Sequence, residues 1–372
     1  MSEVIVVGGG AAGMMAAIAA ADCGHQVTII EKNEKLGKKL FITGKGRCNI
    51  TNDSDVENHL NHVISNPKFM YSAFYSFDSS RMIDFLEQEG LAVKTERGNR
   101  VFPQSDKSSD VLQTLQKALR RRNVTVRLHT KMTGLMIEDH ICKGVKVQSY
   151  HGALETLAAD DVILTTGGLA YPSTGSTGDG HRLLKQAGVA LEPCYPALVP
   201  VETVEEWPIR LQGLSLRNVS LRVERGSHKI YEEQGEMLFT HFGVSGPLVL
   251  SASSLLGRKG AKDCKLHIDL KPALSEEQLD ERLQRDFAAQ KNSMFKNSLG
   301  KLLPSKLIPV IVELSEITPD KQVNEVTRQE RHRLVKLCKD LTCTVKKLRD
   351  FPEAIVTGGG ISVKAINPAT ME

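Results

Sequence analysis

The sequence predicts an α/β fold: a doubly wound, mainly parallel sheet that is interrupted by a mixed β-rich and helical insert domain. Three observations predict it. Val4–Val7 is a short run of Val and Ile that leads directly into a glycine-rich turn and a helix. Asp161–Thr165 is a second apolar run of this kind, and it too is followed by a glycine-rich stretch. Ile355 and Val356 then lead into Gly358–Gly360, which repeats the pattern near the end of the chain.

The first domain opens with a strand, a helix and a second strand. Val4–Val7 has the β-branched composition of a strand that is buried on both faces of a parallel sheet. Ala11–Cys23 is rich in Ala and Met and favours a helix, which Gly24 can end in a left-handed cap. Val27–Ile30 is a second buried strand. Asn33–Asn52 is rich in Gly, Lys and Asn without periodicity, so we expect an extended, functional loop there.

The remaining elements follow from two periodicities. Apolar residues at helical spacing predict helices, and alternating or continuous apolar runs predict strands. The expected helices lie near Arg81–Glu89, Asp110–Arg121, His181–Gln186, Ser275–Gln290 and Lys321–Leu337, and the expected strands are Asn123–Leu128, Ile141–Tyr150, Asp161–Thr165, Leu214–Glu224 and Lys265–Leu270.

The chain changes character after Pro193, where prolines and alternating segments replace the parallel-sheet pattern. We therefore expect a first domain over residues 1–192, an insert over 193–350 and a return to the first domain over 351–372. A chain of 372 residues with 41% hydrophobic and 25% charged residues has ample material for these cores.

Composition excludes several classes of protein. No apolar run approaches the roughly 20 residues of a membrane span, so we expect no membrane partner. The seven cysteines include no C-x-x-C pair and no clustering with histidine, so we expect no metal and a reducing, cytoplasmic setting. The net charge of +4 is too balanced to indicate a nucleic-acid partner. The basic run Lys117–Arg122 is interpreted as a helix end that favours its own dipole.

The strongest local signal is Gly8–Gly13, a G-x-G-x-x-G pattern between a predicted strand and a predicted helix. Its glycines permit a tight turn, a close approach of the backbone to a pyrophosphate and close helix–strand packing. The helix N terminus adds unpaired N–H groups and a positive dipole end. Glu31 ends the next strand, 18 residues after Gly13, which suits a carboxylate that binds the ribose of an adenine dinucleotide.

A second glycine cluster favours FAD over NAD. Thr165–Gly168 follows a later strand of the same sheet, and Gly175–Gly180 precedes a helix. A flavin needs one backbone approach at the pyrophosphate and another beside its ribityl chain and ring, and this cluster supplies the second. The sequence also shows no acid–base set of the kind expected of a nicotinamide-dependent dehydrogenase.

The stretch Gly37–Asn52 is the most specific in the chain. With it, the sequence resembles the BaiN/YhiN-type NAD(P)/FAD-dependent oxidoreductases, also labelled aminoacetone oxidase-like flavoproteins. The resemblance covers nearly the whole chain. Its further motifs are Val4–Gly13, Arg100–Pro103, Thr166–Gly168, Tyr171–Gly180, Pro196–Pro200, Gly235–Pro247, Thr357–Gly360 and Ile366–Met371.

The resemblance implies a Rossmann-like FAD-binding domain and an FAD-dependent oxidoreductase. Such an enzyme moves a hydride through flavin N5 between NAD(P)H, or another electron carrier, and a small organic substrate. In the family pattern Glu31 binds the AMP ribose, the Lys38–Asn49 loop lies along the pyrophosphate and flavin, and the backbone near Met132 contacts the adenine. By their charge, Lys38, Lys39 and Arg47 can also neutralise phosphates or a reduced flavin. The residues expected to hold FAD are Gly8, Gly10, Ala11, Ala12, Gly13, Glu31, Lys32, Lys38, Lys39, Gly44, Arg47, Cys48, Asn49, Met132, Thr166, Gly167 and Gly168.

No catalytic residue is assigned, and Cys48 and His241 are the candidates. Cys48 lies in the loop that faces the flavin, where it is either a redox-active thiol or, more commonly, a small packing residue. His241 lies in the insert and is either a proton donor in the substrate cleft or a buried, hydrogen-bonded histidine. A flavin enzyme needs no protein nucleophile, because N5 accepts or gives the hydride.

The chain departs from the family pattern at its end. Members continue past the Asn-Pro-x-Thr-Met segment with a Gly-Glu-x-x-Asp strand end and a Gly-Gly-Tyr-Asn turn, whereas this sequence stops at Glu372. The resemblance then implies an incomplete FAD site. The alternative function is therefore a truncated, catalytically inert flavoprotein remnant that acts at most as a binding module.

Overall fold

The computed structural model describes residues 1–372 and divides into two units. Unit 1 comprises Met1–Cys194 and Gly359–Glu372, and unit 2 comprises Tyr195–Gly358. The sequence pattern places the two changes after residues 192 and 350. Residues 351–358 stay with unit 2 because this segment still packs there: Ala354 is fully buried, and the N–H of Ile355 donates to Leu198.

A four-stranded parallel sheet forms the centre of unit 1. Its strand order is β10 (Asp161–Leu164), β1 (Glu3–Val7), β2 (Gln26–Ile30) and β6 (Thr125–Arg127). All three strand pairs are parallel, which confirms the predicted α/β class. β1 is almost wholly buried, as its continuous Val and Ile composition predicts.

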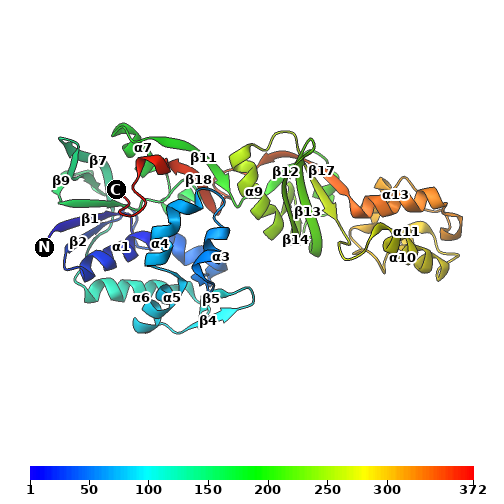
Figure 1. Cartoon of the computed structure of the whole chain (residues 1–372), viewed down its shortest axis with the longest axis horizontal. Coiled ribbons are helices and arrows are strands. Elements are labelled where there is room, and N and C mark those ends of the chain that lie inside the picture. The colour runs from blue at the N-terminus through cyan, green and yellow to red at the C-terminus, as the bar shows by residue number, and fades with distance from the viewer. The chain divides into compact units, whose positions relative to one another are not determined.

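Unit 1 has a core on each face of this sheet, because successive side chains of a strand point to opposite faces. Val4 and Val6 of β1 pack with the helices α1 (Ala11–Asp22) and α6 (Ser108–Arg121). Ile5 and Val7 pack on the other face, against the antiparallel sheet of β7 (Thr130–Glu138), β8 (Ile141–Ser149) and β9 (Leu154–Ala158). Figure 1 shows this layering, with α1 and α6 below the sheet and β7–β9 above it.

The segment Asn33–Asn52 is not one extended loop, and this prediction was wrong. It contains a short helix, α2 (Lys38–Ile42), a tight helical turn at Thr43–Gly46 and a two-residue strand, β3. A five-residue helix leaves too little periodicity to be recognised in the sequence. The other elements of unit 1 are β3 (Thr51–Asn52), α3 (Val56–Asn61), α4 (Tyr71–Ser76), α5 (Ser79–Gln88), β4 (Val93–Glu96), β5 (Arg100–Pro103) and α7 (Asp179–Gln186).

Unit 2 is built on a closed barrel of six strands in the order β12-β15-β14-β13-β16-β17. One continuous apolar core, which includes Phe239, Leu221 and Phe295, joins the barrel to its helices. The barrel strands are β12 (Val201–Thr203), β13 (Ser215–Arg225), β14 (His228–Thr240), β15 (Gly243–Ser245), β16 (Cys264–Asp269) and β17 (Leu341–Leu348). The helices are α8 (Trp207–Arg210), α9 (Pro247–Lys259), α10 (Glu276–Ala288), α11 (Phe295–Ser298), α12 (Ile308–Leu314) and α13 (Arg328–Lys339).

The chain leaves unit 1 along β11 (Leu191–Ala197) and returns to it along β18 (Val356–Ile361), and these two strands form a two-stranded sheet. Gly358–Gly360 lies inside β18, so the turn predicted there is wrong. A Cβ on Gly359 would lie 2.1 Å from the carbonyl oxygen of Pro193. The glycines therefore serve the close approach of the two strands rather than a change of direction.

Two further observations concern the chain as a whole. All seven cysteines are free thiols, and Cys48, Cys264, Cys338 and Cys343 are buried. None of the helices has both the length and the apolar character that crossing a bilayer requires.

Candidate functional site

The N terminus of α1 is an open anion-binding position. Its N-cap residue, Gly10, provides no side-chain cap, and the first turn carries no acidic residue. A Cβ on Gly10 would meet no atom within 4 Å, so the space in front of these amides is free. Because the first N–H groups of a helix have no partner within it, they are available to a phosphate here.

The turn that precedes α1 is held in place by a side chain at the end of the neighbouring strand, β10. The hydroxyl of Thr165, just after β10, donates to the carbonyl oxygens of Val7 (3.0 Å) and Gly8 (2.9 Å). A Cβ on Gly13 would lie 1.8 Å from the Gly8 oxygen, so only glycine allows this helix–strand distance. Thr165 was not predicted as a site residue, although its place in the second glycine cluster is a signal for it.

Glu31 is buried at the end of β2 and faces this turn. Its Oε2 accepts from the N–H of Gly9 (2.7 Å), and its Oε1 accepts from the backbone N–H and the side-chain amide of Asn33 (2.8 Å each). A carboxylate has about four acceptor positions. Three are used by the protein, which leaves one for a hydroxyl of a bound sugar.

A partly buried ion pair connects the second glycine cluster to the end of β2. The Nζ of Lys32 donates to Oδ2 of Asp179 (2.7 Å) and to the hydroxyl of Thr177 (2.6 Å). Burial alone would raise the pKa of Asp179. The contacts from Lys32, Thr177 and Arg182 outweigh burial and hold this pKa below its usual range. Lys32 was among the predicted residues, whereas Asp179 was missed because its partner lies 147 positions away.

The two adjacent lysines of α2 have different surroundings. The Nζ of Lys39 donates to the carbonyl oxygen of Ala170 (3.2 Å) and lies 5.7 Å from the ring centre of Tyr171. Burial lowers the pKa of Lys39. Lys38 instead forms an ion pair with Glu34 at 3.3 Å. Lys39 therefore lies beside the second glycine cluster, and Lys38 does not.

The guanidinium of Arg47 is held by carboxylates. It donates to Glu96 (2.5 Å) and Asp106 (2.5 Å) and stacks on the ring of Phe102, 4.1 Å from its centre. The hydrogen bond from Arg47 lowers the pKa of Glu96. Arg47 thus ties its loop to the β4–β5 hairpin, and its predicted contact with a phosphate or flavin stays a prediction.

The two catalytic candidates belong to different units. Cys48 is buried in the core that also contains α1 and α6, and burial raises the pKa of its thiol, so it is protonated at neutral pH. It has a left-handed φ of 60°, which is unusual for a non-glycine residue. His241 belongs to unit 2, where its ring is exposed and lies 4.8 Å from that of Phe242. The alternative of a buried histidine is therefore wrong.

The remaining predicted residues lie in the first turn of α1 (Ala11 and Ala12), in β7, after β10 and in the loop of Arg47. Met132 is buried in β7, on the face of the parallel sheet that β7–β9 cover, two residues after Thr130, whose N–H donates to the carbonyl of Glu31 (2.9 Å). Thr166, Gly167 and Gly168 follow β10 directly, and Gly44 and Asn49 lie in the loop of Arg47. Which of these residues contact the cofactor stays a prediction.

The residues of this site fit FAD. The free space at Gly10 and the uncapped amides of α1 suit a pyrophosphate, and the remaining acceptor position of Glu31 suits a ribose hydroxyl. FAD supplies hydride transfer when it is bound.

The fold and the site define an FAD-dependent oxidoreductase. The chain belongs to the HI0933-like protein family, whose Rossmann-domain profile matches residues 2–372. It is 31% identical to a 3-dehydro-bile acid delta(4,6)-reductase of Clostridium scindens, over 100% of this chain and 90% of that protein. It is 28% identical to a ribosomal RNA dihydrouridine synthase of Escherichia coli, over 100% of this chain and 88% of that protein. These comparisons confirm the resemblance seen in the sequence.

Proposed function

We propose that the chain is an FAD-dependent reductase of carbon–carbon double bonds that are conjugated to a carbonyl group. The names of the two relatives support this chemistry. A delta(4,6)-reductase of a 3-dehydro steroid and a synthase of dihydrouridine both add two hydrogens across such a bond. The observation that carries the proposal is the free space in front of Gly10, at the N terminus of α1. A reductase of this class needs a bound hydride carrier, and this space can receive its pyrophosphate.

The electron donor in this proposal is NAD(P)H or another reduced carrier that docks transiently. The sheet β10-β1-β2-β6 is the one parallel sheet of the chain, and the residues that we expect to hold FAD lie at its carboxyl edge. A second dinucleotide has no comparable site of its own. NADH or NADPH would therefore reach the flavin site from solution, without a binding site of its own.

In this proposal, different residues of the chain bind the cofactor, position the second glycine cluster and donate the proton. The amides of α1 and Glu31 hold the adenine half of the cofactor, and Lys32 with Asp179 holds the second glycine cluster in place. A saturated product also needs a proton. The exposed ring of His241 is our candidate for its donor, whereas the buried thiol of Cys48 is assigned to packing.

The test begins with the visible spectrum of the purified protein, before and after incubation with FAD. We expect flavin absorbance that stays with the protein through gel filtration. The flavin is then reduced anaerobically with NADH or NADPH and mixed with a steroid 4-en-3-one or with a uridine-containing RNA. Reoxidation by the enone steroid supports a small-molecule substrate.

Three other outcomes would contradict parts of the proposal. A protein that retains no flavin contradicts the proposal that this chain is a flavin-dependent reductase. A flavin that is bound and reduced but reoxidised by neither compound refutes the conjugated-bond chemistry. Reoxidation by RNA alone overturns the expectation that no nucleic acid is a partner.

A further inference from the structure

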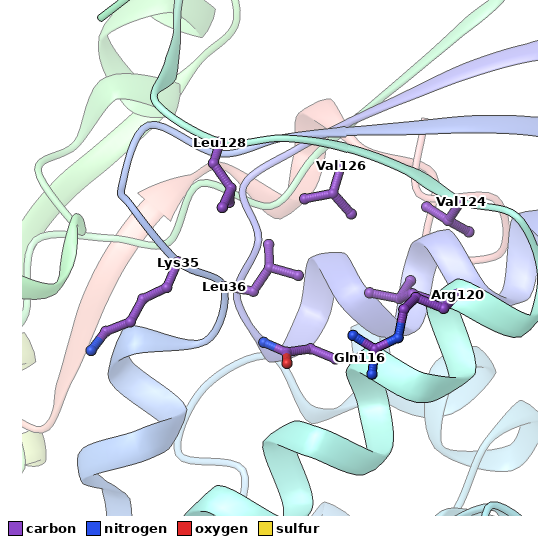
Figure 2. Close-up of a pocket in the computed structure, with 8 residues that line it drawn as sticks. Lys35, Leu36, Gln116, Arg120, Val124, Val126 and Leu128 are labelled. Carbon is purple, nitrogen blue, oxygen red and sulfur yellow. The ribbon is translucent and has the colours of Figure 1, made fainter.

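A groove of about 340 Å³ lies in unit 1 between α6, the edge strand β6 and the segment that follows β2. One wall is made by Val124, Val126 and Leu128, which alternate along the strand and so point to one side. Leu36 and Leu119 form its floor. Figure 2 shows these apolar side chains facing the groove from the strand and from the segment after β2.

The opposite wall is polar, and its two charged groups are both cations. Gln116 and Arg120 reach into the groove from one face of α6, and Lys35 stands at its other end (Figure 2). Arg120 belongs to the basic run Lys117–Arg122 of the sequence. Its neighbours Arg121 and Arg122 form ion pairs with Glu89 and Asp22, whereas Arg120 and Lys35 pair with no carboxylate.

We propose that this groove binds a small amphipathic carboxylate. The apolar body of the ligand lies against Val126 and Leu128, and its carboxylate binds the guanidinium of Arg120 beside the amide of Gln116. A planar guanidinium matches a carboxylate with two parallel hydrogen bonds, which makes arginine the suitable residue for this role. At about 30 Å³ per water-sized group, the groove has room for about eleven such groups, which suits a chain of about ten carbons.

The composition of the groove argues against a nucleic acid. Single-stranded RNA is bound by aromatic side chains that stack on its bases, together with a basic surface. The lining contains no aromatic residue, and its apolar wall is made of Val and Leu alone. A ligand with an aliphatic chain and one anionic group can pack on the apolar wall and bind the cations of the polar wall. A phosphate ion can bind only the polar wall.

The groove is separate from the cofactor site. None of its lining residues is among those expected to hold FAD. Leu36 lies between the two: a Cβ on Gly9 would lie 2.2 Å from its Cδ2. The proposal therefore does not depend on the proposed function and is tested independently of it.

The test is calorimetric titration of the full-length chain with sodium decanoate. We expect saturable binding of one decanoate per chain. Arg120→Gln should weaken the affinity at least tenfold, because it removes a charge-assisted pair. Leu128→Glu, at an exposed position just after β6, should abolish binding by placing a negative charge in the groove. Lys117→Gln, on the same helix but outside the groove, is the matched control and should leave the affinity unchanged.

Two probes separate the parts of the ligand. Acetate carries the charge alone and decan-1-ol the body alone, and both should bind at least tenfold more weakly than decanoate. Equal affinity for acetate or inorganic phosphate would overturn the proposal in favour of a simple anion site. Tighter binding of oligouridylate that Arg120→Gln removes would point to nucleic acid instead. Decanoate affinity that neither Arg120→Gln nor Leu128→Glu changes would also refute this site.

Discussion

The space in front of Gly10 contains no other atom of the protein. Gly10 has a φ of −78°, which every residue type tolerates, and a Cβ there would meet open space. Its substitution therefore tests the cofactor site without straining the fold. Few glycines in the chain combine these two properties, since most others have a left-handed φ or a close neighbour.

We expect Gly10→Val to abolish flavin retention, because a branched side chain would occupy the space proposed for the pyrophosphate. The measurement is the ratio of flavin to protein absorbance after gel filtration, with circular dichroism as a check of folding. Gly300→Val is the matched control, since Gly300 also meets no atom within 4 Å and has no left-handed φ. A Gly10→Val protein that copurifies with wild-type amounts of flavin would place the site elsewhere.

Sequence patterns predicted the positions of residues in the fold well where the neighbouring elements are close in sequence. The turn Gly8–Gly13 and the acid Glu31 lie where their spacing placed them, because both belong to one short strand–helix–strand unit. Partners that are distant in sequence were not predictable. Asp179 and Thr165 hold the site through contacts 147 to 158 positions away, and no local pattern encodes such a distance.

At the scale of elements, the site depends on how the second glycine cluster is attached to β2. The ion pair of Lys32 and Asp179 is mostly buried, with exposed side-chain fractions of 24% and 16%. The pKa of Asp179 is lowered in the fold, so the unfolded chain binds more protons between the two pKa values. The pair therefore stabilises the protein above pH 4, and this contribution is lost as the pH falls through the folded pKa.

We expect Lys32→Met to lower the free energy of unfolding by about 1 kcal/mol at pH 7, the upper range for partly exposed pairs. The difference from wild type should shrink as the pH falls below 4 and through the folded pKa of Asp179. Thermal unfolding midpoints at pH 7 and at a series of lower pH values measure it. Lys38→Met is the control, since its partner Glu34 is half exposed and the pair is longer. A difference that stays constant with pH would indicate lost packing of the lysine stem instead.

Element boundaries show where sequence reasoning ends. The helix predicted over Lys321–Leu337 begins only at Arg328, because Thr327 and Glu330 form a capping box that starts it there. The capping pattern is visible in the sequence, but the polar residues before it also suit a helix. Val323, five residues before the start of α13, is buried in a separate short turn, and that contact is set by tertiary packing.

At the scale of the whole molecule, unit 2 has a closed barrel and one continuous core of its own. A closed barrel has no free sheet edge, and its chain runs uninterrupted from Tyr195 to Gly358. We therefore expect residues 195–358 to fold alone with cooperative thermal unfolding and to bind no flavin. Circular dichroism and the visible spectrum measure both.

Thiol reactivity gives an independent readout of this folding. Cys264, Cys338 and Cys343 of unit 2 are fully buried, and burial raises the pKa of Cys338 to about 12. These thiols should react with Ellman's reagent only after denaturant is added. In the full chain the exposed Cys23 should react at once and serves as the positive control. Immediate reaction of all three thiols in residues 195–358 would show that the excised barrel is not folded.

The paired strands β11 and β18 carry the chain out of unit 1 and back. Because the Pro193 carbonyl passes directly against Gly359, the two cut points of the host domain are adjacent. A tight turn of a few residues would rejoin them. Because the two ends of the insertion are adjacent, recombination can replace unit 2 with another domain without changing the order of the elements in unit 1.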